Sequence, residues 1–113
     1  SSTSRGLGDV YKRQIIAWEI LSKTIEAAMS VSDLDAARAM RCLKYCKNSQ
    51  HSIEAGESST AGLAGLILSL NTPALKQKLK IDDSSQILLI GSEGVTDPDI
   101  YKKIITGEVL SEA

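Results

Sequence analysis

The sequence is poor in cysteine and histidine, the residues that build disulfide frameworks and zinc sites and that a Cys-His or Ser-His catalytic pair requires. Its two cysteines, Cys42 and Cys46, lie four residues apart in a helical pattern, with no further pair to complete a metal site. We expect them to be buried, reduced thiols, and we expect no bound metal. His51 is the only histidine, so a Cys-His or Ser-His catalytic arrangement would have to use it. Nothing in the sequence places beside it the third group that such an arrangement needs to orient the histidine. A solvated loop histidine is the prediction.

Excess charge and long apolar runs are also missing. The chain has thirteen Lys and Arg residues and fourteen Asp and Glu residues. It therefore lacks the excess of basic residues that would predict nucleic-acid binding. No apolar run approaches the roughly 20 residues that span a bilayer, and the start of the chain lacks a signal-peptide pattern. We expect a cytoplasmic protein without nucleic-acid or membrane partners. The content of 42% hydrophobic and 24% charged residues predicts a packed core.

The first fourteen residues look foreign to the rest of the chain. Ser4 to Gln14 reads SRGLGDVYKRQ, which is similar to one translated reading frame of a transposase-type sequencing adapter. We hypothesise that residues 1–14 are an artefact of library preparation and form no domain, and that residues 15–113 are the natural sequence. The pair Gly6 and Gly8 predicts no phosphate loop, because no strand precedes it.

The first half of the chain has a helical pattern. Apolar residues recur at helical spacing over 18–29, which predicts one buried face: Trp18, Leu21, Ile25, Ala28 and Met29. Ser32 is the predicted N-cap of a second helix over 33–46, because Asp33 and Asp35 then lie in its first turn, where the helix dipole favours negative charge. We therefore expect two amphipathic helices.

The second half alternates turns with apolar segments. A turn at residues 56–60 precedes an apolar helix over 61–70, with Ser58 or Ser59 as its expected N-cap, and Thr72-Pro73 begins another helix. Residues 86–90 form an apolar run bounded by turn residues, typical of a strand covered on both faces. A last helix follows Asp97-Pro98, with its apolar residues at helical spacing: Ile100, Tyr101, Ile104 and Ile105.

This order of elements predicts an α/β fold with an incomplete parallel sheet and flanking helices. A parallel strand buried on both faces needs neighbours, and only a second possible strand near Ile53 is found. We therefore expect the missing strands upstream of Ile15. In open α/β sheets, ligands bind at the carboxyl ends of strands, which directs attention to the glycine-containing segments 56–60 and 91–94.

Six short motifs occur along the chain: Trp18-Glu-Ile-Leu21, Arg38-Ala-Met-Arg41, Ala55-Gly-Glu-Ser58, Ala61-Gly-Leu63, Ser92-Glu-Gly94 and Thr96-Asp97. In sequence and in order they resemble the motifs of one enzyme family, the diaminopropionate ammonia-lyases. The resemblance covers residues 18–107. It implies a pyridoxal-phosphate (PLP) enzyme of fold type II, the tryptophan-synthase β type, that removes ammonia from 2,3-diaminopropionate to give pyruvate.

On this resemblance, the chain is the C-terminal fragment of a lyase catalytic domain. Gly56, Glu57 and Ser58 would border the cofactor or substrate, while Gly91 and Ser92 would approach the pyridine nitrogen. No lysine stands where the resemblance places the Schiff base, so we expect the catalytic lysine and the phosphate loop upstream. The fragment would then be inactive alone, and the full-length protein a homodimer acting on a small amino acid.

Two departures and two alternatives stay open. Gly91 stands where the family tends to have serine, and Ser59-Thr60 stands where it has Gly-Ala. A threonine synthase or a threonine or serine dehydratase would keep the fold with another substrate. A non-catalytic small α/β interaction module would make the chain complete as it stands.

Overall fold

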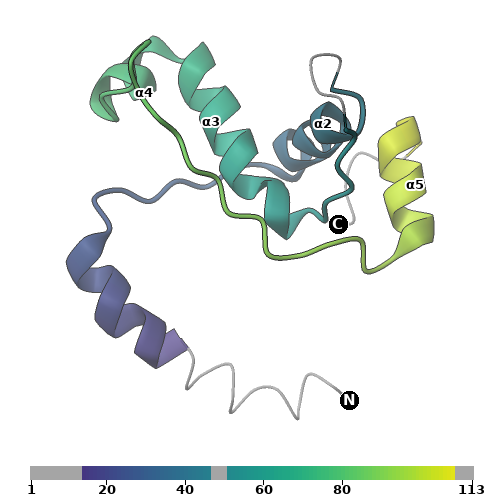
Figure 1. Ribbon diagram of the computed structural model, residues 1–113, viewed down its shortest axis with the longest axis horizontal. Helices are drawn as coiled ribbons and strands as arrows, with labels where there is room; N and C mark the ends of the chain where they lie inside the picture. Colours follow the sequence, from purple (N-terminus) through teal and green to yellow (C-terminus); the bar gives the residue numbers. More distant parts are fainter. Residues whose placement is uncertain (1–13, 47–50, 109–113) are drawn as a thin grey trace.

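The computed structural model describes residues 14–46 and 51–108, and within these ranges every regular element is a helix. A first helix spans residues 14–24. The later elements are α2 (Asp33–Lys44), the short 3₁₀ helix η1 (Ser58–Thr60), α3 (Ala61–Asn71), α4 (Pro73–Lys78) and α5 (Pro98–Thr106) (Figure 1). Of the segment hypothesised to derive from an adapter, only Gln14 is described, so that hypothesis stays untested.

The expected α/β fold with a parallel sheet is wrong for the described chain. Residues 86–90 run as an extended segment across α3 (Figure 1), and neither they nor the stretch around Ile53 form a strand. Leu88 is 84% exposed and Ile90 79% exposed. A strand exists only through ladder hydrogen bonds to a neighbour, and no second extended segment among residues 14–46 and 51–108 supplies one. The apolar run was identified correctly, but its pairing was not.

The start of α2 is the capping box that its first turn predicts. The amide of Asp35 donates to the Ser32 hydroxyl at 3.1 Å, and the Asp35 carboxylate accepts from the Ser32 amide at 3.4 Å. Two amides that the helix leaves without partners are satisfied in this way. The prediction of Ser32 as N-cap is confirmed, and α2 ends at Lys44, two residues before its expected end.

The core lies between α2 and α5. Ala37 and Met40 of α2 pack against Ile104 and Ile105 of α5, and Ile100 and Tyr101 cover this cluster from the side. The Asp97 carboxylate caps α5 by accepting from the amides of Asp99 and Ile100, each at 3.1 Å. Gly107 ends the helix with a φ of 84°, a left-handed conformation that glycine adopts without a steric penalty. The predicted last helix is confirmed.

Thr60 links the start of α3 to α2. Its buried hydroxyl donates to the carbonyl oxygen of Glu57 at 2.9 Å and lies 3.4 Å from that of Ala36. Neither Ser58 nor Ser59 caps α3, contrary to expectation, because the chain enters α3 through the continuous helical turn of η1. Thr72 and Pro73 start α4 as predicted.

The first helix was expected to reach Met29 and to bury one face. It ends at Thr24, and every residue from 14 to 30 is exposed, including Trp18 at 64%. Figure 1 shows this helix standing apart from α2 and α3. Burial of an amphipathic face needs a second apolar surface, and the described residues place none against it. The prediction of its burial was wrong.

Cys42 and Cys46 are both exposed, so the prediction of buried thiols was wrong as well. Within residues 14–46 and 51–108, no cluster of three or more His, Cys, Asp or Glu side chains is arranged to hold a metal ion. In the same ranges, no helix has both the length and the apolar content to cross a bilayer.

Candidate functional site

The two glycine-containing segments singled out from the sequence lie against each other. The amide of Gly56 donates to the carbonyl oxygen of Glu93 at 3.2 Å. The Ser59 hydroxyl accepts from the amide of Glu93 at 2.5 Å and donates to the carbonyl oxygen of the same residue. Segment 56–60 at the start of α3 and segment 91–94 ahead of α5 are thereby joined across more than thirty residues of sequence.

Glycine at position 56 is required by this close approach. A Cβ atom on Gly56 would lie 2.7 Å from the carbonyl oxygen of Gly94, which is backbone and cannot rotate away. A Cβ on Gly91 would meet the Cβ of Ser59 at 3.4 Å, a tight but tolerable contact. Gly94 has open space where its Cβ would stand. The approach of the two segments therefore depends most on Gly56.

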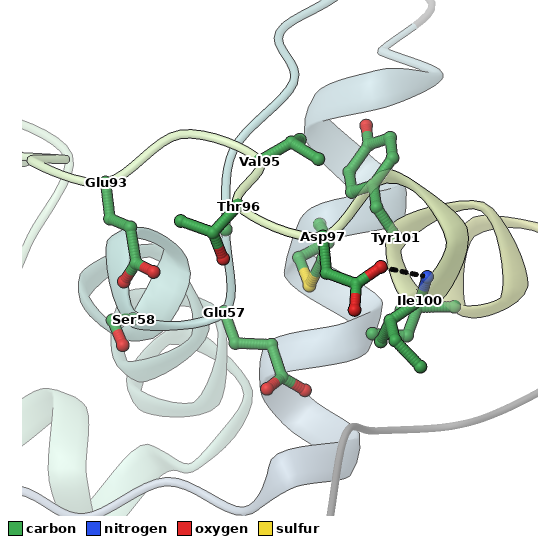
Figure 2. A pocket seen from close by; sticks show the side chains of 11 residues that line it. Glu57, Ser58, Glu93, Val95, Thr96, Asp97, Ile100 and Tyr101 are labelled. Atoms are coloured by element: carbon green, nitrogen blue, oxygen red, sulfur yellow. Dashed lines mark hydrogen bonds between the residues drawn. The ribbon is translucent and has the colours of Figure 1, made fainter. Parts of the chain in front are cut away.

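The contact divides the candidate site into two hollows. On one side is a crevice of about 70 Å³ between the η1 turn and the start of α5, which includes Gly56, Glu57 and Ser58 in its lining. Figure 2 shows Glu57 and Ser58 on one wall of this crevice, with Thr96 and Asp97 on the other. Ligand pockets for small molecules usually measure about 300–1,000 Å³, so this crevice is too small for a ring-shaped cofactor.

On the other side is a groove of about 570 Å³, which falls in the range of small-molecule sites. Gly91 and Ser92 line it, with apolar walls from Leu63 and Leu89. Glu93 belongs to both hollows. The five residues predicted for the site thus fall into two groups, with Gly56, Glu57 and Ser58 in the crevice and Gly91 and Ser92 in the groove.

Charge in the lining of the groove comes from acidic side chains. Glu54 lines the groove and forms an ion pair with Lys44 at 2.8 Å. The hydrogen bond to Glu54 raises the pKa of the Lys44 ammonium above its usual value. Since both side chains are substantially solvated, the pair contributes little to stability. It leaves Lys44 outside the lining of the groove, with its ammonium held by Glu54.

Tyr101 is the unusual polar group beside the crevice. Its side chain lines the crevice, and its buried hydroxyl has no hydrogen-bond partner among the described residues. Desolvation raises the pKa of this hydroxyl above its ordinary value. Tyr101 was assigned to the hydrophobic face of α5 from its spacing, and that spacing carries no information on its hydroxyl.

Sequence reasoning did not identify the contact between Ser59 and Glu93. Ser59 was considered as a helix cap and, with Thr60, as a departure from the family's Gly-Ala, and Glu93 only as part of a motif. Their meeting depends on how α3 and the chain ahead of α5 cross, which no local pattern reports. A third hollow of about 690 Å³ lies between residues 26–31 and helices α3 and α4, and contains neither predicted segment.

Comparisons with known proteins give the relationships of the chain. No family model matches it, and no solved structure matches it. A diaminopropionate ammonia-lyase of Salmonella typhimurium strain LT2 is 33% identical over 95 residues, which is 80% of this chain and 24% of that protein. The diaminopropionate ammonia-lyase of Escherichia coli strain K12 is 31% identical over 93 residues, 80% of this chain and 23% of that protein.

The chain thus spans about a quarter of the length of the curated relatives it matches. The resemblance inferred from its motifs is confirmed by these two proteins. Over most of its own length, this chain is a relative of part of a diaminopropionate ammonia-lyase.

Proposed function

We propose that this chain forms part of a PLP-dependent ammonia-lyase, which converts 2,3-diaminopropionate and water to pyruvate and two molecules of ammonia. The observation that carries the proposal is the similarity to enzymes of that name over 80% of the chain. It is supported by the contact between segments 56–60 and 91–94, which are the segments that the motifs indicate.

The described residues fit one edge of the cofactor. Ser92 is exposed and lines the groove of about 570 Å³, where its hydroxyl can donate a hydrogen bond to a pyridine nitrogen. PLP, when bound, withdraws electron density from the α-carbon of the amino acid. A hydroxyl partner leaves the ring nitrogen neutral, which limits that withdrawal and suits elimination of a leaving group. Leu63 and Leu89 can cover the apolar faces of the ring.

The other edges of the cofactor need residues from elsewhere. Within the described ranges, no lysine lines the crevice or the groove, and no arginine lines them either. We propose that the Schiff-base lysine and the phosphate-binding loop come from the remaining three-quarters of the protein. In this arrangement Glu57 and Ser58 lie on the far side of the Ser59–Glu93 contact, where the crevice admits only small groups. The complete protein is expected to be a homodimer.

The test is to express the uninterrupted gene that contains residues 15–113. The purified protein should absorb as a PLP imine and release pyruvate from 2,3-diaminopropionate. Serine and threonine belong in the same assay, because preference for either would assign the protein to a dehydratase instead. A full-length product that binds no PLP contradicts the proposal.

The residue-level arm uses Ser92→Ala, with Ser22→Ala on the exposed first helix as the control. Loss of the hydroxyl at position 92 should shift the absorbance of the bound cofactor and lower kcat about 10- to 100-fold. The Ser22→Ala protein should match wild type in both measurements. Equal spectra and rates for all three proteins would remove Ser92 from the site.

A further inference from the structure

We propose that Ser59 determines the size of the ligand that this site accepts, because its hydroxyl closes the passage between the groove beside Ser92 and the crevice beside Glu57. The identity of the ligand rests on the proposed function. The partition itself is a property of this chain and can be tested separately.

The backbone of Glu93 is bonded at both of its polar atoms. Both polar backbone atoms of Glu93 bond to the Ser59 hydroxyl, and its carbonyl oxygen also accepts from the amide of Gly56. The backbone at position 93 is therefore held from two points of segment 56–60. A side chain without a hydroxyl at position 59 would remove the hydrogen bonds from residue 59 and leave the Glu93 amide without that partner. The bond from the Gly56 amide would remain.

Glu93 lies between the two hollows. Glu93 lines both the crevice and the groove, and Ser59 lines the groove. Gly91 lies against Ser59 on the groove side, with the carbonyl oxygen of Ser59 3.5 Å from the position of a Cβ atom at residue 91. The Ser59–Glu93 contact is thus the wall that separates Ser92 from Glu57.

The two hollows differ in size. The groove measures about 570 Å³, whereas the crevice measures about 70 Å³. Small-molecule sites usually measure about 300–1,000 Å³, so the groove can hold a small molecule and the crevice cannot. A ligand in the groove therefore ends at the Ser59–Glu93 contact, and a ligand longer by one methylene would have to displace that contact.

The test uses the intact protein with Ser59→Gly, Ser59→Ala and Ser59→Thr, the last of which retains a hydroxyl. Hydrogen exchange at the amides of Glu93 and Gly56 should accelerate about tenfold or more in the glycine and alanine variants and stay near wild type in the threonine variant. Ser58→Ala is the matched control for exchange, because Ser58 is the exposed neighbour in the same turn.

The second readout is inhibition by 2,4-diaminobutyrate, which is longer than the proposed substrate by one methylene. Its Ki, relative to the KM for 2,3-diaminopropionate, should fall about tenfold in Ser59→Gly and Ser59→Ala, and Ser59→Thr should restore the wild-type ratio. A general loss of structure would change KM and kcat together without altering this ratio.

The outcomes separate the two proposals. Faster exchange with an unchanged inhibition ratio overturns the role in ligand size, and equal exchange in all variants overturns the partition. If the intact protein has no lyase activity, the proposed function fails and so does the role in selecting its substrate. The exchange measurement still decides whether the Ser59 hydroxyl stabilises the contact with Glu93 that separates the two hollows.

Discussion

The guanidinium of Arg41 donates through Nε to the backbone carbonyl oxygen of Ile104, 2.9 Å away and 63 residues later in the sequence. That carbonyl oxygen also accepts from the amide of Gly107 at the end of α5. Arg41 therefore stabilises the last turn of α5 while joining it to α2. The contact lies beside the apolar cluster of Ala37, Met40 and Ile104, so it sets how the two helices meet.

Replacement of Arg41 by methionine should weaken this junction. We expect Arg41→Met to lower the free energy of unfolding by about 1–2 kcal/mol, because a hydrogen bond to a charged donor is lost. Arg38→Met is the control, since Arg38 is exposed on the same helix and its loss should change stability by less than about 0.5 kcal/mol. Urea unfolding followed by circular dichroism measures both. Equal midpoints would show that the Arg41 contact contributes nothing.

Alanine substitutions at Gly56 and Gly94 form a matched pair that tests how closely the two site segments approach each other. Gly56→Ala places a Cβ 2.7 Å from the Gly94 carbonyl oxygen, so the backbone must shift and the 3.2 Å bond to Glu93 must lengthen. We expect a loss of about 1–3 kcal/mol in unfolding free energy. Gly94→Ala meets no atom within 4 Å and should stay within about 0.5 kcal/mol of wild type. Similar losses in both variants would contradict the steric explanation.

Substitution of Ile104 tests whether the core lies between α2 and α5. Its side chain is 1% exposed between α2 and α5, so Ile104→Ala should cost about 2–5 kcal/mol through lost burial and the cavity left behind. Leu88→Ala, at a position with 84% exposure, should cost less than about 0.5 kcal/mol. Chemical denaturation of the two variants gives the comparison. A larger effect at Leu88 would place that residue in a packed interface instead.

The raised pKa of Tyr101 predicts that the free energy of unfolding depends on pH under alkaline conditions. Burial raises the pKa of its hydroxyl above the ordinary value of 10.0, so the folded chain binds that proton more tightly than the unfolded chain. The corresponding stability is fully present below the unfolded pKa, and it is lost as the pH rises through the folded pKa. Unfolding free energies measured from about pH 9 to about pH 11 should fall less steeply in Tyr101→Phe than in wild type.

At neutral pH the same substitution should cost little. The buried hydroxyl of Tyr101 has no hydrogen-bond partner among the described residues, so its removal leaves no group newly unsatisfied. We expect Tyr101→Phe to lie within about 1 kcal/mol of wild type, or to be slightly more stable. A loss of several kcal/mol at neutral pH would mean that the hydroxyl is bonded in solution.

Local signals predicted the helix starts well. Ser32, Thr72 and Asp97 each mark the first turn of a helix, and the bonds of Ser32 and Asp97 reach amides only two or three residues away. Such contacts form within one segment, whatever the rest of the chain does. The candidate segments 56–60 and 91–94 were found in the same way, from residue types suited to turns.

Residues 86–90 show what a local sequence pattern cannot predict. The apolar run is real, but a strand needs a neighbour with free backbone groups, and the pattern of one segment cannot state whether a neighbour is there. The first helix fails for the same reason. Its apolar spacing predicted a helix as far as Met29, but the helix ends at Thr24 and the described fold places no apolar surface against Trp18.

The sequence by itself determined the caps of α2 and α5, the turn-forming glycines and the order of motifs shared with the ammonia-lyases, because each depends on neighbours in the chain. Only the tertiary structure decided that Ser59 bonds to Glu93 and that this contact divides the site into a crevice and a groove. That contact joins residues 34 positions apart, and it exists only once α3 and the segment before α5 have packed together.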